Sequence, residues 1–211
     1  MPVEDIRPIK AGLREHYKAL RRAMTPEQKA ALDKAIARRV AALWQYKKQD
    51  LLLTYVSTPI EVDTTAIIRR ALKDGKRVAV PRCVPNTRQM EFYLIESLDE
   101  LEPGTFGVLE PRPDPARLLT DPRKGLCLVP ALCYDWKGFR LGYGKGYYDR
   151  FLAEFDGPIV GICYSSCIRR SLPHGRYDRP VELLVTDRYF RRTDREPFSK
   201  GKPPMSTNKQ R

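Results

Sequence analysis

The sequence predicts a single α/β domain in which a mostly parallel sheet is flanked by helices. Short apolar runs of strand length alternate with segments of helical periodicity, and this alternation is typical of parallel sheets covered on both faces. The chain has 211 residues, of which 42% are hydrophobic. That is enough for one domain with a substantial core and short for two independent ones. We expect the domain to occupy residues 1–190.

Two helices are expected before the first strand. In the first, apolar side chains recur at the helical spacing: Leu13, Tyr17, Leu20 and Met24. The second has a clear start signal, because Thr25 can cap it, Pro26 suits its first position and Gln28 completes a capping box. The apolar stripe of this second helix consists of Leu32, Ile36, Val40 and Leu43.

Strands and helices alternate through the rest of the domain. Strands are expected at residues 51–56, 77–81, 90–95, 126–130, 158–164 and 183–186. Helices are expected at residues 64–73, ending at Gly75, and at residues 147–155. The proline-rich residues 110–122 are expected to form an irregular surface segment. Ligands bind such sheets beyond the carboxyl ends of the strands, so the loop after Pro130 is the expected site.

Positive charge is enriched at the C-terminal end. Lys and Arg number 39 against 26 Asp and Glu, a formal net charge of +13. Residues 191–211 carry seven basic and two acidic residues, so they contribute +5 and leave +8 to the rest. We expect these residues to form a disordered, solvated tail, an interpretation we favour over an RNA or membrane tether. The remaining charge suits an enzyme of polyanionic substrates and a nucleic-acid binder equally.

The cysteines and the hydropathy pattern indicate a cytoplasmic protein. The longest nearly apolar run, residues 125–134, has about half of the ~20 residues that a membrane span needs. The first residues mix charges of both signs and contain no apolar block of the kind found in secretory signals. The five cysteines are expected to be reduced thiols in or near the core. Cys163 and Cys167 have no second pair at zinc-ligand spacing, so no metal site is expected there.

The most informative segment for chemistry is residues 140–150. Gly142, Gly144 and Gly146 alternate just before a helix, so backbone N–H groups there can turn inward around a phosphate. Arg140 and Lys145 add full positive charges. The spacing fits neither the Walker A motif nor the dinucleotide-binding fingerprint. A flexible glycine turn before a helix is the simpler alternative.

Two carboxylates near this loop are candidate magnesium ligands. Asp149 lies in the first turn of the expected helix, where an acid usually just interacts favourably with the helix dipole. Beside a phosphate-binding loop, it is also where a Mg²⁺ ligand would lie, since Mg²⁺ takes one or two carboxylates plus phosphate oxygens and waters. Asp178, in a polar loop before the last strand, is a candidate partner. Spacing alone leaves the metal role and the dipole role equally open.

Residues 129–135, Gly138 and residues 140–151 together resemble the signature of the 5-formyltetrahydrofolate cyclo-ligases, also called 5,10-methenyltetrahydrofolate synthetases. The likeness extends over residues 10–187 and includes, in family order, residues 10–14, 60–64, 106–111, Asp178 and residues 185–186. The resemblance implies the fold shared by ribose-5-phosphate isomerase and CoA transferase-like proteins. It also implies an enzyme that closes 5-formyltetrahydrofolate to 5,10-methenyltetrahydrofolate with ATP and Mg²⁺, releasing ADP and phosphate through a phosphorylated formyl intermediate.

The resemblance assigns a role to each matching residue. The nucleotide-binding set is Lys10, Arg14, Arg140, Leu141, Gly142, Tyr143, Gly144, Lys145, Gly146, Tyr147 and Tyr148. Lys10, Arg14 and Lys145 would also act in catalysis, and Asp149 and Asp178 would hold Mg²⁺. Val56, Glu61 and Tyr147 would face the folate. From the residues alone, Glu61 is an exposed acid ahead of a helix, and Lys10 and Arg14 belong to a solvated helix face.

The residue types agree with phosphoryl transfer. Such transfer depends on positioning and charge neutralisation and needs no protein nucleophile. His16 and His174 are the only histidines and lie outside the motif. The resemblance implies folate and ATP as partners, and we expect no membrane, no nucleic acid and a monomeric chain. The alternative function is a basic nucleotide- or RNA-binding protein of the same fold without cyclo-ligase activity.

Three positions depart from the family pattern. Cys167 stands where Gln is frequent, Tyr177 where His precedes the second metal carboxylate, and Glu182 where Asp is usual. Glu182 keeps the charge but is one methylene longer, which puts the geometry around Asp178 in question. Retention of Glu61, Asp149 and Asp178 together favours the enzyme over the binding protein, because phosphate binding alone needs no folate-facing acid.

Overall fold

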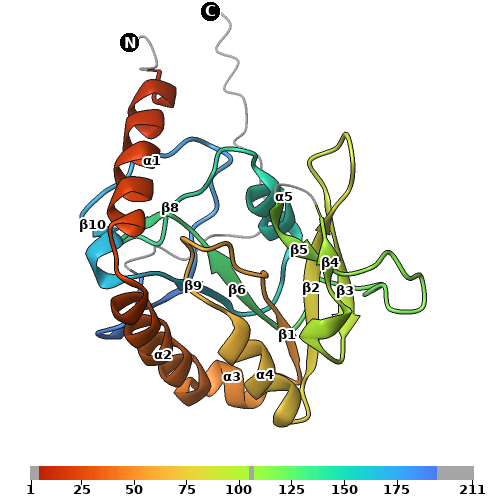
Figure 1. Cartoon of the computed structure of the whole chain (residues 1–211). Helices are drawn as coiled ribbons and strands as arrows, with labels where there is room; N and C mark the ends of the chain where they lie inside the picture. The colour runs from red at the N-terminus through yellow and green to blue at the C-terminus, as the bar shows by residue number, and fades with distance from the viewer. Residues whose placement is uncertain (1–4, 105–106, 194–211) are drawn as a thin grey trace, which may run out of the picture.

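A seven-stranded sheet, in the order β12-β11-β9-β6-β1-β2-β3, forms the centre of the molecule (Figure 1). The structure is a computed structural model that describes residues 5–104 and 107–193. The strands are β1 (Leu51–Leu53), β2 (Arg77–Cys83), β3 (Met90–Ile95), β6 (Leu126–Pro130), β9 (Ile159–Ile162), β11 (Leu183–Val185) and β12 (Phe190–Arg192). The five inner strands pair in parallel, and the edge strands β3 and β12 are antiparallel to their neighbours. The predicted mostly parallel sheet is confirmed.

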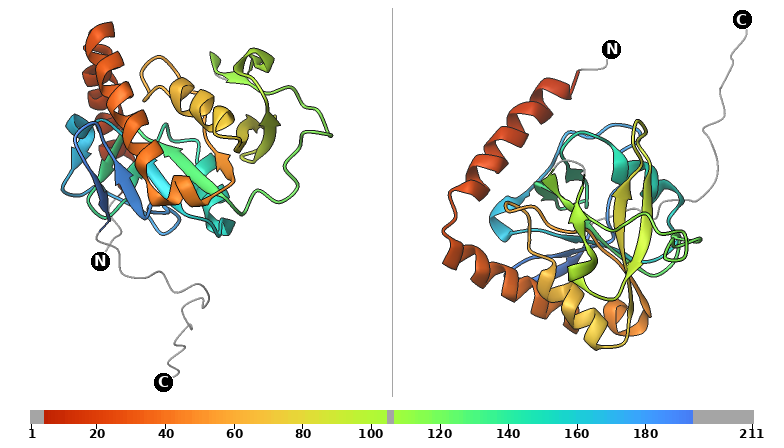
Figure 2. Two further views of the ribbon diagram at one scale, coloured as in Figure 1. Left: turned by 90° about the horizontal axis from the view of Figure 1, so that it is seen from below. Right: turned by 45° about the vertical axis from the view of Figure 1, so that its right-hand side comes forward.

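The helices cover both faces of this sheet. They are α1 (Arg7–Arg22), α2 (Pro26–Ala42), α3 (Trp44–Lys48), α4 (Thr65–Lys73) and α5 (Tyr147–Glu154). Helices α2 and α4 lie on one face, and α5 lies on the other (Figure 2). The sequence predicted all of these helices except α3. Inside the described ranges, no helix has the length and apolar content needed to cross a membrane.

The local signals at the helix ends act as expected. Thr25 Oγ1 accepts a hydrogen bond from the N–H of Gln28 at 3.2 Å, and Gln28 Oε1 accepts one from the N–H of Thr25 at 3.1 Å. This reciprocal capping box starts α2 at Pro26. Helix α4 ends before Gly75, whose φ of 75° lies in the left-handed region that glycine adopts without strain.

The inner strands are buried on both faces, which explains their nearly continuous apolar composition. All four residues of β9 are buried, as are four of the five residues of β6. Cysteines contribute to this core: Cys127, Cys133, Cys163 and Cys167 are buried, and Cys83 is half-buried. The prediction that the cysteines are core or near-core thiols is therefore confirmed.

Several short elements have no local signal in the sequence. A small three-stranded sheet joins β10 (Ile168–Arg169), β7 (Cys133–Asp135) and β8 (Arg140–Leu141). A hairpin joins β4 (Glu102–Pro103) to β5 (Leu109–Glu110), and 3₁₀ turns form at Leu98–Glu100 and Ser165–Cys167. The proline-rich segment is irregular as predicted, apart from Glu110 in β5 and one bridge from Leu118 to Tyr93.

Two predicted boundaries are wrong. The strand expected over residues 51–56 ends at Leu53, because the chain there leaves the sheet to form the rim of a cavity. The tail was expected from residue 191, but Arg191 and Arg192 belong to β12, where pairing with β11 holds them. The predicted tail residues 194–211 lie outside the described residues.

The chain order of the strands creates a topological switch point between β1 and β6. From β1 the chain moves outward to β2, and from β6 it moves in the opposite direction to β9. The loops that leave the carboxyl ends of β1 and β6 therefore diverge and leave a crevice, the usual ligand-binding position in such sheets.

Candidate active site

A cavity of about 650 Å³ lies at this switch point. It is large enough for a drug-sized ligand. The cavity brings together every residue that the sequence singled out: Lys10, Arg14, Val56, Glu61, Arg140, Leu141, Gly142, Tyr143, Gly144, Lys145, Gly146, Tyr147, Tyr148, Asp149 and Asp178. They come from α1, from the loop after β1, from β8, the first turn of α5 and the loop between them, and from the loop before β11.

The glycine loop is held against α1. Gly144 and Gly146 have φ values of 93° and 79°, and Gly146 is the N-cap of α5. A Cβ atom at Gly144 would lie 3.2 Å from the guanidinium carbon of Arg14. Arg14 Nε also donates to the carbonyl of Gly142 at 2.8 Å. Glycine is thus needed here both for the backbone conformation and for the close approach of a cation.

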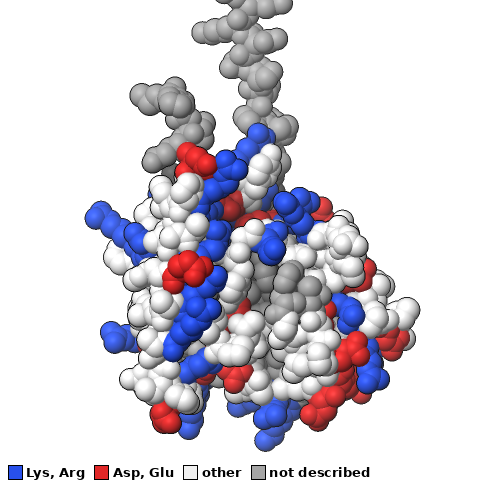
Figure 3. All heavy atoms as spheres, turned by 45° about the horizontal axis from the view of Figure 1, so that its top comes forward, with Lys and Arg blue, Asp and Glu red and all other residues white. Residues whose placement is uncertain are grey.

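Helix α1 brings basic side chains to this loop, and Figure 3 shows Lys and Arg side chains following the helix along one side of the molecule. Lys10 Nζ forms an ion pair with Asp178 Oδ2 at 2.6 Å. The same oxygen accepts a hydrogen bond from the N–H of Gly175 at 2.8 Å. The expected phosphate-binding lysine and the expected metal-binding carboxylate are therefore in direct contact.

Asp149 is held in a similar way. Its Oδ1 accepts a hydrogen bond from Arg140 at 2.6 Å and another from the N–H of Arg179 at 3.1 Å. Because Arg179 follows Asp178 directly, the two carboxylates are brought to the same part of the cavity. No cluster of three or more His, Cys, Asp or Glu side chains suited to a metal ion occurs among the described residues. Two carboxylates beside a phosphate-binding loop fit Mg²⁺, which takes its other ligands from phosphate and water.

Glu61 is a buried carboxylate in the wall of the cavity, not the exposed acid that the residues alone suggest. Its side chain is 6% exposed, and its Oε2 accepts the N–H of Thr58 at 2.8 Å. Burial raises the pKa of Glu61 above the ordinary value for a glutamate. Burial and the neighbouring Glu61 charge also raise the pKa of Tyr143 to about 12. The hydroxyl of Tyr148 is buried with no hydrogen-bond partner in the described part of the chain.

Two sets of comparisons place this geometry among known proteins. The sequence profile of the 5-formyltetrahydrofolate cyclo-ligase family matches residues 7–187. The chain belongs to that family. A probable 5-formyltetrahydrofolate cyclo-ligase from Schizosaccharomyces pombe is 30% identical over 168 residues, covering 72% of this chain and 82% of the relative. The 5-formyltetrahydrofolate cyclo-ligase of Escherichia coli is 28% identical over 170 residues, covering 79% and 93%.

Solved structures of the same family share the fold. The 5,10-methenyltetrahydrofolate synthetase of Aquifex aeolicus superposes with a TM-score of 0.73 at 28% identity, covering 95% of this chain and 98% of the other. The synthetase of Mycoplasma pneumoniae has a TM-score of 0.65 at 24% identity, covering 84% of this chain and 98% of the other, and this likeness concerns the fold alone. The family resemblance seen in the sequence is thus confirmed.

Arg21 is a buried residue of this cyclo-ligase fold that the sequence analysis missed. Its guanidinium is 3% exposed and donates to the carbonyls of Ile60, Ala131 and Leu132. It therefore joins the loop after β1, which carries Glu61, to the loop after β6. One signal was available, since Arg21 continues the apolar face of α1 four residues after Tyr17.

The cavity also has lining residues to which the sequence analysis assigned no role. They are Tyr55, Thr58, Pro81, Cys83, Met90, Val108, Leu109, Glu110 and Pro130. Most come from β2, β3 and the hairpin β4–β5, so the antiparallel pairing of β3 with β2 and the return of the hairpin place them. Tyr147 reaches this side, where its hydroxyl is 3.4 Å from the carbonyl oxygen of Thr87.

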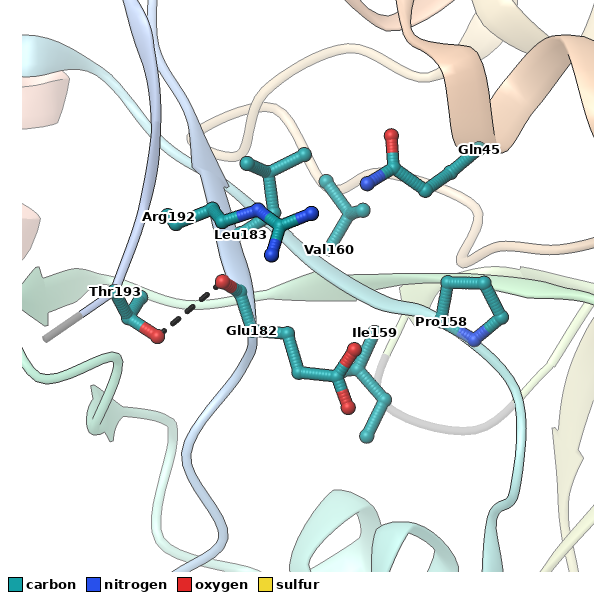
Figure 4. Close-up of a pocket in the computed structure, with 8 residues that line it drawn as sticks. All are labelled: Gln45, Pro158, Ile159, Val160, Glu182, Leu183, Arg192 and Thr193. Carbon is teal, nitrogen blue, oxygen red and sulfur yellow. Dashed lines mark hydrogen bonds between the residues drawn. The ribbon is translucent and has the colours of Figure 1, made fainter. Parts of the chain in front are cut away.

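The three departures from the family pattern lie outside the cavity lining. Cys167 is buried next to Cys163, and the side chain of Tyr177 is highly exposed. Glu182 lines a second cavity of about 360 Å³ between β9, β11 and β12 (Figure 4). In that cavity Thr193 Oγ1 donates to the backbone carbonyl of Glu182 at 3.3 Å. The extra methylene of Glu182 is accommodated there, away from the cavity that Asp178 lines.

Proposed function

We propose that this chain catalyses the ATP-dependent cyclisation of 5-formyltetrahydrofolate to 5,10-methenyltetrahydrofolate, with release of ADP and phosphate. Membership of the family supports this reaction. The observation that carries the proposal for this chain is the composition of its cavity. One cavity holds a glycine loop with four cations at one side and a buried carboxylate, Glu61, among aromatic side chains at the other.

The cationic side suits the phosphates of ATP. Lys10, Arg14 and Lys145 line it together with the backbone of the glycine loop. Inward N–H groups and the N-terminus of α5 favour negative charge, and the cations neutralise the charge that shifts during transfer. Arg140 orients Asp149, so its contribution to the phosphates is through position as well as charge.

Asp149 and Asp178 would hold Mg²⁺ here. The ion would neutralise negative charge on the phosphate oxygens. In the ligand-free chain these carboxylates are paired with Arg140 and Lys10. These two ion pairs, Lys10 with Asp178 and Arg140 with Asp149, would have to separate for the carboxylates to hold Mg²⁺ and for the cations to contact phosphate.

The reaction needs the formyl oxygen converted into a leaving group. We propose that this oxygen attacks the γ-phosphorus of ATP, that the bond from phosphorus to the bridging oxygen breaks and that ADP leaves. The N10 amine then attacks the activated formyl carbon, loses its proton and expels phosphate. N10 and N5, which carries the formyl group, belong to one bound molecule. The cavity therefore mainly holds N10 close to the formyl carbon and excludes water.

The other side of the cavity suits the folate. Val56 and Tyr147 offer apolar surface, and Glu61 offers a buried acceptor. The raised pKa of Glu61 also makes this side chain able to share a proton near the reacting nitrogens. A protein that only binds nucleotides or RNA gains nothing from a buried carboxylate beside its phosphate loop, so the cavity favours the enzyme over that alternative.

A direct assay tests the proposal. Purified protein is mixed with 5-formyltetrahydrofolate, and the absorbance of the methenyl product is followed with ATP, without ATP, and with ATP plus excess chelator. Product is expected in the first mixture alone, and added Mg²⁺ should restore the chelated reaction. Equal product formation in chelator would overturn the metal requirement, and no product with ATP and Mg²⁺ would overturn the proposed reaction.

A further inference from the structure

The folate side of the cavity contains a second buried carboxylate, which lies in residues 106–111 of the family resemblance but has been given no role. Glu110, in β5, is 4% exposed and lines the cavity. The same wall of the cavity, built by β2, β3 and the hairpin, is lined by Pro81, Met90, Val108 and Leu109, with the Cys83 thiol beside Glu110. A charged group in such surroundings is costly unless hydrogen-bond donors or cations compensate it.

The protein itself provides little compensation for this charge. The N–H of Cys83 donates to Glu110 Oε1 over a long 3.4 Å. Arg82 turns instead to Glu102 and to the carbonyl of Pro111, and Arg112 also pairs with Glu102. Within residues 5–104 and 107–193, no lysine or arginine forms an ion pair with Glu110. The carboxylate lines the cavity, and the donors of the described residues leave part of its acceptor capacity unused.

The local backbone is shaped around this side chain. A Cβ atom at Gly104 would lie 2.5 Å from Glu110 Cγ and 2.6 Å from its Oε2. Only glycine leaves room for the carboxylate between the two strands of the hairpin. Burial and the neighbouring Glu110 charge raise the pKa of Cys83, so this thiol stays protonated next to the carboxylate. Gly104 and Cys83 thus lie against the Glu110 side chain from two sides and fix its position.

Glu61 and Glu110 differ in the hydrogen bonds that their carboxylates already accept and in their place in the cavity. Glu61 already accepts the N–H of Thr58 at 2.8 Å, and Tyr143 of the glycine loop lies beside it, so Glu61 occupies the part of the folate side that is nearest to that loop. Glu110 belongs to the hairpin that closes the apolar side. A folate ring has one edge with two adjacent donors, the 2-amino group and N3–H of the pterin, which match the two oxygens of a carboxylate.

We propose that Glu110 is a specificity-determining residue whose carboxylate accepts hydrogen bonds from the 2-amino group and N3–H of the pterin ring. The ring lies on the apolar wall formed by β2, β3 and β5, and its formyl group points toward the glycine loop. A buried acceptor of this kind rejects analogues that lack the donors, because its oxygens are then left unpaired. This inference rests on the proposed function, since it names the group that recognises the substrate.

The first experiment compares Glu110→Gln with Glu102→Gln, a matched change in the same hairpin outside the cavity lining. Glu110→Gln is expected to raise KM for 5-formyltetrahydrofolate about 10- to 150-fold, the worth of hydrogen bonds to a charged group, and to leave KM for ATP within about twofold. Glu102→Gln should change neither constant. Equal KM values for folate in Glu110→Gln and wild type overturn the inference, provided that thermal melting shows both variants folded.

A second experiment identifies the part of the substrate that Glu110 contacts. Binding of 6-methyl-5-formyltetrahydropterin, which retains the pterin and lacks the aminobenzoylglutamate, is measured by calorimetry without ATP. Glu110→Gln should weaken binding of this fragment and of the whole folate by the same factor. An unchanged affinity for the fragment overturns the assignment to the pterin edge. Because binding is measured without turnover, this result stands even if the proposed reaction fails.

Gly104→Ala provides an independent variant that leaves the carboxylate in the chain. The added methyl group must displace Glu110, so KM for folate is expected to rise as it does in Glu110→Gln. Gly12→Ala is the control, since a Cβ at Gly12 meets nothing within 4 Å. A folded Gly104→Ala protein with wild-type KM for folate contradicts the placement of Glu110 against the ring.

Discussion

Lys10 Nζ lies 2.6 Å from Asp178 Oδ2, although 168 residues separate the two in the chain. Their side chains are 15% and 23% exposed, so the ion pair is partly shielded from water. In the proposed reaction Lys10 contacts phosphate and Asp178 contacts Mg²⁺. In that reaction nucleotide binding and metal binding would be coupled, because phosphate would have to draw Lys10 away from Asp178 and Mg²⁺ would have to draw Asp178 away from Lys10.

This coupling predicts the behaviour of Asp178→Asn. The substitution releases Lys10, so affinity for ATP in the absence of metal should rise by up to about fivefold, since partly exposed ion pairs are worth about 0.2–1 kcal/mol. The rate with Mg²⁺ should fall, because one metal ligand is lost. Calorimetric titration of ATP with and without Mg²⁺ measures both effects. Asp121→Asn, which breaks a pair with Arg123 outside the cavity lining, is the control.

Weaker metal-free ATP binding in Asp178→Asn would contradict the competition between the two ligands. It would mean that Asp178 positions Lys10 for phosphate and does not restrain it.

The raised pKa of Glu61 predicts that the stability of the protein depends on pH. This pKa is raised by burial, so the native state binds the proton more tightly than the unfolded state. The free energy of unfolding must then fall as the pH rises from the unfolded pKa, near 4.5, through the raised native pKa. Glu61→Gln lacks this titration. The stability difference, variant minus wild type, is expected to grow with pH across that window and then to level off.

Urea unfolding of the two proteins at several pH values measures this difference. A difference that is constant with pH, or that shrinks as pH rises, would show that the native pKa of Glu61 is not raised. Activity does not enter this test, so it is independent of the proposed reaction.

The C-terminal residues supply the next prediction. Thr193 donates to the carbonyl of Val181 at 2.8 Å, so it anchors β12 and should be kept in a truncated chain. Removal of residues 194–211 is expected to leave kcat within about twofold at physiological ionic strength, because we expect their basic charge to act only at long range, where salt screens it. Steady-state assays of the truncated and full chains check this. A tenfold loss of kcat would assign these residues a role at the cavity.

The fold was predictable wherever its signals are local. Thr25, Gln28 and Gly75 mark helix ends through contacts within a few residues, and the buried inner strands are continuous apolar runs. The short strands β7, β8 and β10 were not predictable. Their pairing joins Tyr134 to Ile168, which are distant in sequence and carry no pattern of their own.

The candidate site also has one part that the sequence could indicate and another part that it could not. The glycine loop and Asp149 form a contiguous motif, so the sequence could indicate them. Glu110 and Cys83 meet only because the β2–β3 pair and the hairpin fold onto one side of the cavity. Arg21 resembles the solvated basic residues around it, and only its place on the apolar face of α1 distinguishes it.

The last prediction separates phosphate contact from metal contact within the glycine loop. Lys145→Ala removes a charge and a flexible donor from the cavity lining but keeps the backbone N–H groups and Asp149. Hydrogen bonds to charged groups are worth about 1.5–3 kcal/mol, so ATP affinity should weaken about 10- to 150-fold. Lys73→Ala, at the exposed end of α4, is the matched control.

Asp149→Asn keeps the size of the side chain and weakens metal coordination, so kcat should fall and excess Mg²⁺ should restore part of it. Separate titrations of ATP and Mg²⁺ against both variants distinguish the roles, and rescue of Lys145→Ala but not Asp149→Asn by Mg²⁺ would reverse the two assignments.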